Sequence, residues 1–316
     1  MYRNREHEEL LKVKPLASVV ICTYNRAGYL KKCLDSMLNQ NYDNFEVIVV
    51  NGPSTDETEN LLKKYPFKVI QQKEKGGLSA ARNLGIKEAK GEIIAFIDDD
   101  GIADESWLYE LTKLYTTEDI VSVGGKIMPI WLSEKPEWYT NQLGSYLSLL
   151  DISQNIKQIV FPDCPYGCNM SFKKSIFNVV GYFDVSFGRC LSKNNLLSGE
   201  EVDLCKRINE RGYKILYNPK AIVHHQIDPS RVTKAWFRKR FYWGGISGAV
   251  FNKKHHGTGY VFKFTMRALF LAIPYNLVRY SLERIKGDNK SFVRELSLLS
   301  NLGYVKGSLG LNFGGR

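Results

Sequence analysis

The sequence lacks any run of about 18 uncharged apolar residues, so no segment is expected to span a bilayer by itself. The stretch 260–282 comes closest, but three basic residues and a proline interrupt it. Residues 1–14 are polar and charged, and we therefore expect no signal peptide. Internal repeats are also missing, which argues against a solenoid.

Cysteine is sparse and scattered, with six residues in 316 and no spacing typical of a disulfide framework. Cys164 and Cys168 lie close together, but no second cysteine or histidine pair follows at the spacing of a zinc site. Reduced thiols in a cytosolic protein are therefore expected.

Three other signatures are missing. No G-x-G-x-x-G follows an expected strand, which excludes a dinucleotide-dependent dehydrogenase. No RNA-recognition motif or zinc knuckle is present, which weakens the case for a basic RNA- or anionic-lipid-binding protein. The first strand leads into Thr-Tyr-Asn-Arg-Ala-Gly at 23–28, not into the glycine-rich basic loop of a nucleotidyltransferase that makes nucleotide sugars. The basic RNA- or anionic-lipid-binding protein and the nucleotidyltransferase remain as alternatives.

Acidic residues are fewer than basic residues: the chain has 33 Asp and Glu against 44 Lys and Arg, giving a formal charge of +11. This balance favours phosphorylated substrates, anionic lipid or nucleic acid as partners, and does not choose among them.

The first half of the chain alternates strand-like with helix-like segments, a pattern that predicts an α/β fold whose mainly parallel sheet has helices on both faces. Expected strands are 17–22, 45–50, 68–71, 92–97 and 120–127, and expected helices are 29–38, 55–65, 78–89 and 105–115. Residues 131–159 are expected to form a loop or short helices. A helix at 200–211 and short strands at 214–217 and 221–223 follow.

Near residue 228 the composition changes to a basic, aromatic-rich and largely helical extension, 229–316. We therefore divide the chain into a catalytic domain, 1–228, and this extension. Within the catalytic domain, about 16–127 is the expected nucleotide-binding half and about 128–228 the acceptor half.

Polar clusters follow three of the expected strands, at Thr23-Tyr24-Asn25, Asn51-Gly52-Pro53 and Asp98-Asp99-Asp100. Ligands of open parallel sheets bind beyond these carboxyl ends. Three adjacent carboxylates repel one another unless a cation lies among them, and Mn²⁺ or Mg²⁺ prefers oxygen ligands. The sequence therefore predicts a metal and phosphate site at this sheet edge.

Seven motifs, in order, resemble those of family 2 glycosyltransferases with the GT-A fold. They are SVVICTYNR at 18–26, VVNGPSTD at 49–56, GLSAARN at 77–83, Asp98–Asp100, GCNMSF at 167–172, GYFD at 181–184 and GEEVDL at 199–204. Each motif is weak alone, and their common order carries the resemblance. It implies a GT-A catalytic domain, to which the C-terminal helical extension is added, and an inverting, metal-dependent transfer of a sugar from a nucleotide diphosphate.

The resemblance also implies donor-binding residues, namely Thr23, Tyr24, Asn25, Asn51, Arg82, Asp98 and Asp99. Asn51 stands where the family usually has an aspartate, so the identity of the base (UDP, dTDP or GDP) stays open. Asp100 would bind Mn²⁺ or Mg²⁺. One of His224 and His225 is expected to assist it. We assign His225 as a metal ligand although sequence alone does not separate the two, since adjacent strand residues face opposite ways.

For the acceptor side, the resemblance implies Asn169 and Gly199 as binding residues and the Glu200-Glu201 pair as catalytic. A hydroxyl acceptor needs a base to take its proton. Glu201 occupies the family's base position, where aspartate is usual, and Glu200 is the alternative. Asp203 is expected to hold local structure.

The extension predicts membrane contact. Segment 236–243 mixes aromatic with basic residues and 260–280 is amphipathic, a combination suited to an anionic membrane surface. A basic helix packed on the catalytic domain is the competing interpretation. The expected partners are thus a nucleotide-sugar donor, a glycan or lipid-linked acceptor and an anionic membrane, without nucleic acid. The expected location is cytoplasmic, peripheral on the inner face of the membrane.

Overall fold

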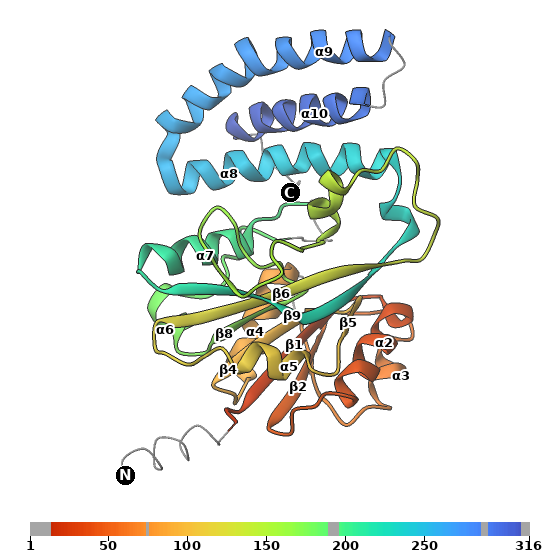
Figure 1. Cartoon of the computed structure of the whole chain (residues 1–316), viewed down its shortest axis with the longest axis vertical. Helices are drawn as coiled ribbons and strands as arrows, with labels where there is room; N and C mark the ends of the chain where they lie inside the picture. Colours follow the sequence, from red (N-terminus) through yellow and green to blue (C-terminus); the bar gives the residue numbers. More distant parts are fainter. Residues whose placement is uncertain (1–13, 74–75, 189–195, 286–289, 311–316) are drawn as a thin grey trace.

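The computed structural model describes residues 14–73, 76–188, 196–285 and 290–310 (Figure 1). A β-sheet with helices on both faces forms the body, and three C-terminal helices lie together at one end of it.

Four parallel strands build the first half of the sheet, in the spatial order β3-β2-β1-β4. They are β1 (Ala17–Thr23), β2 (Phe45–Asn51), β3 (Lys68–Gln71) and β4 (Ile93–Asp98). Thr23 pairs with Asn51, and Cys22 with Asp98. The polar clusters that follow β1, β2 and β4 therefore meet at one edge, as the sequence predicted.

Helices α2 (Ala27–Leu38), α3 (Thr58–Leu62) and α4 (Gly77–Glu88) connect these strands. The connections through α2 and α3 run one way along the sheet and the connection through α4 runs back. Because such crossovers are right-handed, α2 and α3 cover one face and α4 the other. Figure 1 shows α2 and α3 together beside the parallel strands.

The second half of the sheet is mixed. Strand β8 (Met170–Lys173) is antiparallel to β4 and to β6 (Ile120–Trp131), and β6 is parallel to β9 (Lys214–Ile227). Strands β5 (Gly101–Ala103) and β7 (Lys157–Ile159) both pair antiparallel with β9. Helices α5 (Trp107–Thr112), α6 (Ile176–Val180) and α7 (Glu200–Glu210) complete this half.

Two expectations for this half need correction. The short strands predicted at 214–217 and 221–223 are parts of the single strand β9, because β6 pairs along it across a register shift at Gly125. Strand β8 was not predicted. In the region expected to be a loop or short helices, the short helix η1 (Asn141–Leu147) forms as expected, but β7 also lies there.

A second hydrophobic core joins the sheet domain to the extension. It is formed by side chains of η1 and the residues just before it, the end of β9 and the segment after it, and helices α8 (Lys234–Arg267) and α10 (Lys290–Ser308), namely Tyr139, Leu143, Leu147, Ile227, Val232, Phe237, Phe241, Phe292 and Leu296. Phe237 and Phe241 belong to the segment 236–243 for which we predicted membrane contact. Their rings are buried here, while Arg238 and Lys239 between them are exposed.

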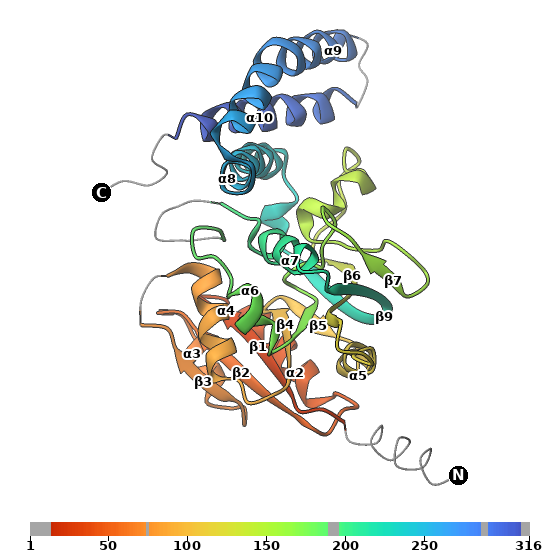
Figure 2. The ribbon, with the colours of Figure 1, turned by 90° about the vertical axis from the view of Figure 1, so that its left-hand side faces the viewer.

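Helices α8 and α10 pack closely through glycines. A Cβ on Gly245 would lie 1.9 Å from Ser300 O, and one on Gly303 would lie 2.0 Å from Tyr242 O. The close approach fixes α10 against α8, and the π-helix η4 (Ala268–Ala272) and α9 (Ile273–Ile285) continue from α8 across the end of the molecule (Figure 2).

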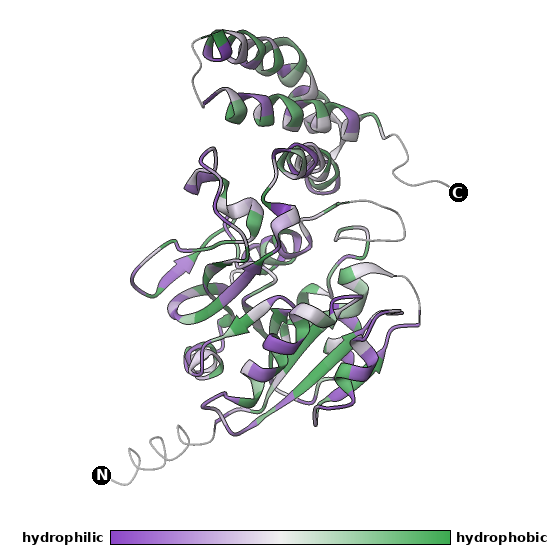
Figure 3. Cartoon of the chain, turned by 90° about the vertical axis from the view of Figure 1, so that its right-hand side faces the viewer, coloured by the Kyte–Doolittle hydropathy of each residue, from purple (hydrophilic) through white to green (hydrophobic). Residues whose placement is uncertain are grey.

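The surface of this end is unusually apolar. The outer apolar surface consists of large exposed side chains on α8, η4 and α9, namely Phe262, Leu269, Phe270, Leu271, Tyr275, Leu277, Val278, Leu282 and Ile285. Figure 3 shows apolar residues along α9, at the far end from the sheet. By length and composition alone, the helical segment Lys234–Ile285, whose backbone is non-helical at Gly257, could cross a membrane.

Candidate active site

A cleft of about 640 Å³ opens at the carboxyl ends of the parallel strands. Its lining combines the polar residues after β1 and β4 with the start of α7. From the first half of the chain these include Thr23, Tyr24, Arg26, Gly52, Arg82, Asp98, Asp99 and Asp100. From the second half they include Ser145, Tyr146, Tyr166, Gly167, Ser198, Gly199, Glu200, Glu201, His225, Arg231 and Arg240.

The three aspartates after β4 have different surroundings. Asp98 is the most exposed, with 34% of its side chain accessible, and lies 3.3 Å from Arg82 Nη2. Asp99 is buried, where its carboxylate accepts a hydrogen bond from Thr23 Oγ1 at 2.8 Å and lies 3.0 Å from Arg26 Nε. Thr23 therefore supports the acidic cluster from β1.

Asp100 lies at the centre of a positively charged group. Its carboxylate is 2.6 Å from Arg26 Nη2, 3.4 Å from Arg231 Nη1 and 3.2 Å from His225 Nε2. Gly101, the next residue, pairs with His225 across β5 and β9, and this register brings the imidazole to the carboxylate. His224 pairs with Ile102 instead and does not line the cleft.

Burial and charge act in opposite directions on the two buried aspartates. Burial raises the pKa of Asp99 to about 7, although the Arg26 charge and the Thr23 hydrogen bond oppose the shift. Burial also disfavours the Asp100 charge, but His225, Arg231 and Arg26 outweigh it and hold the pKa of Asp100 well below its usual range. Asp100 is therefore held as an anion by these neighbours.

The His225–Asp100 pair fits a divalent cation. His225 Nδ1 lies 2.9 Å from Leu147 O. A carbonyl oxygen only accepts, so Nδ1 carries a proton and donates it to Leu147 O, which leaves Nε2 facing the Asp100 carboxylate. Between Nε2 and the carboxylate oxygen, 3.2 Å apart, either a proton or, in its place, a metal cation held by both groups would be favourable.

Asp98 and a cysteine complete this neighbourhood. Carboxylate oxygens of Asp98 and Asp100 and Sγ of Cys168 lie within 4.8 Å of one another. Burial raises the pKa of the Cys168 thiol well above its ordinary value, which keeps the sulfur neutral and a weak ligand. The oxygen and nitrogen donors suit Mn²⁺ or Mg²⁺ better than a soft metal.

Arg82 links the two halves of the cleft. Its guanidinium is 2% exposed and lies 3.3 Å from Asp98, 3.2 Å from Glu200 and 3.1 Å from Glu201, measured to a carboxylate oxygen of each. Gly167 leaves room for this arginine, since a Cβ there would lie 1.9 Å from Arg82 Nη2. Arg82 thus fixes the start of α7 against the acidic end of β4.

The two candidate bases differ in access. Gly199 precedes α7 with a φ of +115°, a conformation that L side chains rarely adopt, and turns the chain into the helix. The side chain of Glu201 is 17% exposed to the cleft, whereas that of Glu200 is 4% exposed. Access to a substrate hydroxyl therefore favours Glu201.

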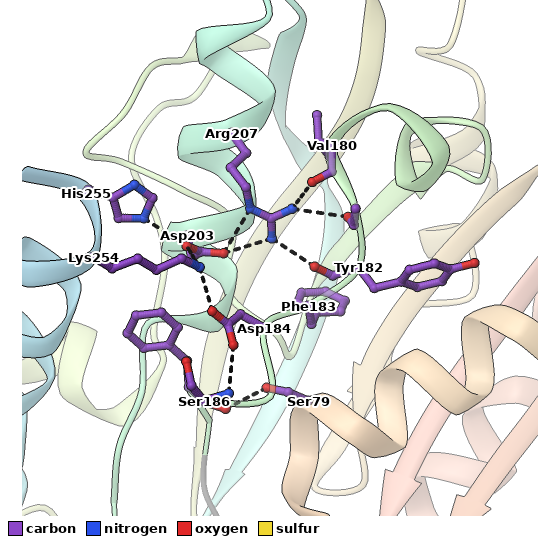
Figure 4. A network of polar contacts seen from close by, with 12 residues as sticks. Ser79, Val180, Tyr182, Phe183, Asp184, Ser186, Asp203, Arg207, Lys254 and His255 are labelled. Carbon is purple, nitrogen blue, oxygen red and sulfur yellow. Dashed lines mark hydrogen bonds and ion pairs between the residues drawn. The ribbon is translucent and has the colours of Figure 1, made fainter.

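Asp203, one turn further along α7, fixes the helix to its surroundings (Figure 4). Its buried carboxylate accepts hydrogen bonds from Arg207 at 2.8 Å and from Lys254 at 2.6 Å, and lies 2.8 Å from His255 Nε2. Lys254 also donates to Asp184 at 2.6 Å. Although burial disfavours the charge, these partners lower the pKa of Asp203. Helix α8 thereby holds the helix that carries Glu201.

Three predicted site residues lie outside the cleft lining of the described chain. Asn25 Oδ1 accepts from Thr55 N at 2.6 Å. Asn51 is buried, where it donates to Gln71 and accepts from Ser54. Asn169 is also buried and accepts from Trp107 Nε1. Its amide donates to the carbonyls of residues 126 and 221. In this structure their polar groups support the walls of the cleft.

Three lining arginines were not assigned by the sequence analysis. Arg26 ends the first motif, so its position was visible but its reach to Asp99 and Asp100 was not. Arg231 and Arg240 lie beyond the boundary drawn at residue 228, and the membrane interpretation of the basic extension hid their contribution to the cleft. The packing of α8 against η1 brings Arg240 there, and Arg231 lies between β9 and α8.

The chain is similar in sequence to known glycosyltransferases. A sequence model of the family "Glycosyl transferase family 2" matches residues 18–180. The chain is 29% identical over 243 residues to the glucosyl-dolichyl phosphate glucuronosyltransferase of Haloferax volcanii, covering 74% of this chain and 76% of the relative. It is 26% identical over 240 residues to the glycosyltransferase AglE of the same organism, covering 72% and 71%.

The fold is also similar to that of solved glycosyltransferase structures. The mannosyltransferase PcManGT from Pyrobaculum calidifontis, in complex with GDP-Man and Mn²⁺, superposes with a TM-score of 0.62 at 17% identity, covering 98% of this chain and 94% of that chain. GalNAc-T7 with UDP, GalNAc and Mn²⁺ superposes with a TM-score of 0.55 at 17% identity, covering 75% and 51%. The GT-A fold and the helical extension predicted from the sequence are confirmed.

Proposed function

Since the chain belongs to glycosyl transferase family 2, and is thus a glycosyltransferase, we propose that it moves a sugar from a nucleotide diphosphate to a hydroxyl of a glycan or lipid-linked acceptor, with inversion. The observation that carries the proposal is the single cleft in which an acidic strand end, Asp98–Asp100, faces the accessible carboxylate of Glu201 across Arg82. One side suits a diphosphate and its metal, and the other suits a hydroxyl that must lose a proton.

Glu201 is the proposed base. Its partly exposed carboxylate accepts the proton of the attacking hydroxyl, and Arg82 at 3.1 Å orients it. Among the described residues, the only carboxylates in the cleft lining are Asp98–Asp100 and the Glu200-Glu201 pair, so no separate nucleophile is present. A single displacement at the anomeric carbon follows, and it inverts configuration.

Mn²⁺ or Mg²⁺ is the proposed cofactor, held by Asp100 and His225 with Asp98 beside them. When bound, such a cation offsets negative charge on the leaving nucleoside diphosphate. Thr23, Tyr24, Asp98 and Asp99 line the proposed donor side, with Arg82 close to them. Gly199 borders the proposed acceptor side, while Asn25, Asn51 and Asn169 would act through the walls that they support.

A peripheral position on a membrane is part of the proposal, with the cytoplasmic inner face as the location. The outer apolar surface supports it, as does similarity to a relative named for a dolichyl phosphate acceptor. Buried Glu283 on α9, 3.3 Å from Arg294 Nε on α10, favours a helix lying on the membrane over one crossing it. Residues 229–316 are the proposed membrane-associating part, although Arg231 and Arg240 also serve the cleft.

A thermal-shift panel of UDP-, dTDP- and GDP-sugars with Mn²⁺ tests the proposal. The matching donor at a hundred times its Kd should stabilise the fold by about 2.7 kcal/mol. Loss of that shift in Asp100→Ala, with the melting temperature of the free protein retained, would support the assigned site. A panel without any stabilising nucleotide would contradict donor binding.

A further inference from the structure

Arg240 enters the cleft from α8, outside the part of the chain that the family match covers. Its Nη1 donates to Ser198 Oγ at 3.2 Å, and Ser198 lies directly before Gly199 and the candidate base pair. The side chain therefore borders the acceptor side of the cleft, next to Tyr146 and Ser198 of the lining.

The bonding of Arg240 differs from that of the other arginines in the lining. Arg26, Arg82 and Arg231 each lie within 3.4 Å of at least one carboxylate oxygen. Among the residues that the structure describes, Arg240 forms no ion pair within 4.0 Å and one hydrogen bond, to Ser198, and its buried Nε has no hydrogen-bond partner. Its guanidinium is thus bound by one neutral hydroxyl.

Such an arrangement is costly unless a ligand completes it. Burial lowers the pKa of Arg240, although Glu200 and Glu201 oppose the shift from a distance. A guanidinium keeps its charge, and its Nε is buried here without the hydrogen bond that would offset the loss of water. Since this cation lines an open cleft, an anion of the substrate is the missing partner.

The position of Arg240 decides which substrate supplies the anion. The donor diphosphate is expected near Asp98 and Asp100, where Arg26 and Arg231 already lie. A hydroxyl that gives its proton to Glu201 must come within hydrogen-bond distance of that carboxylate. The group next to Glu201, Ser198 and Arg240 therefore belongs to the acceptor.

Resting on the proposed function, we propose that the acceptor carries a phosphate close to the hydroxyl that receives the sugar, and that Arg240 binds this phosphate. The planar guanidinium offers paired donors that match phosphate oxygens, and Nε is one of the two donors of such a pair. Arg240 would thus select phosphate-linked acceptors over neutral glycosides.

Calorimetric titration of the full chain with octyl phosphate tests the assignment, with octanoate and octyl glucoside as comparison probes. Titrations are made with and without saturating nucleoside diphosphate and Mn²⁺, which occupy the donor side. Arg240→Gln is compared with Lys239→Gln, a matched control that removes an exposed charge from the neighbouring position on α8. Melting curves verify that both variants fold.

We expect Arg240→Gln to weaken octyl phosphate binding at least about tenfold, with octyl glucoside and nucleotide binding unchanged, and Lys239→Gln to match wild type. Equal octyl phosphate affinity in wild type and Arg240→Gln would overturn the proposal. So would a larger loss for the nucleotide than for octyl phosphate, which would assign Arg240 to the donor, or an equal loss for octanoate. Failure of all nucleotides to bind would contradict the proposed function, while the octyl phosphate titrations without nucleotide would still decide the role of Arg240.

Discussion

Glu201→Gln separates the chemistry of the cleft from its architecture. The change replaces a carboxylate by an amide of nearly equal shape, so the acceptor proton loses its base. Arg82 keeps Asp98 and Glu200 as partners at 3.3 and 3.2 Å, which should preserve the position of α7. The free energy of unfolding should therefore change little.

The expected effect on rate is large. Removing a general base lowers kcat about a hundred- to ten-thousandfold. This corresponds to about 2.7 to 5.4 kcal/mol in the activation barrier. Donor affinity should be unchanged, since Glu201 faces the acceptor. Glu200→Gln should have a milder effect on kcat, because only 4% of that side chain is exposed.

Two assays make the comparison. Single-turnover transfer measures the chemical step, and calorimetric titration with the donor measures binding in both variants. A Glu201→Gln enzyme with a rate near that of wild type would refute the assignment of the base. A product with retained anomeric configuration would refute the single displacement.

Two further outcomes are expected. The pKa of Asp203 lies below its ordinary value, and that of Asp184 is lowered to about 2, because Lys254 bonds to both and outweighs their burial. The stability that they contribute is present above the ordinary pKa of 3.8 and is lost as the pH falls towards about 2. The melting temperature should therefore drop between about pH 5 and pH 2, and should drop less in Asp203→Asn; equal drops would contradict the network. The full chain should bind anionic vesicles in sedimentation assays, and less tightly at higher salt, since exposed charges are screened within about 8 Å. The double variant Phe270→Ser with Leu271→Ser should bind more weakly, whereas Val185→Ser, on the sheet domain, should not. Equal binding by wild type and both variants would exclude the outer apolar surface as the binding site.

The sequence predicted the parallel half of the fold well, because apolar β-branched runs such as those of β1 and β2 are buried on both faces and end in polar residues. The mixed half was harder. Strand β8 has only four residues, and its place between β4 and β6 depends on pairings distant in sequence. No local sequence pattern predicts pairings between strands so far apart in the chain.

The site divides in the same way. Motifs placed Asp98–Asp100 and the Glu200-Glu201 pair correctly at one cleft, since strand ends and helix starts are local features. The distinction between His224 and His225 required the register of β5 on β9. The place of Arg240 in the cleft could be found only from the packing of α8 on η1. In that packing, aromatic residues that suggested a membrane-binding segment form a core.

The release of nucleoside diphosphate from a nucleotide sugar tests the central claim most directly. With the donor found in the thermal-shift panel, wild type in Mn²⁺ should release the nucleoside diphosphate, faster when an acceptor is present. EDTA should stop the reaction, excess Mn²⁺ should restore it, and Asp100→Ala should remain inactive although folded. Release that continues unchanged in EDTA and in Asp100→Ala would contradict a metal-dependent glycosyl transfer in this cleft.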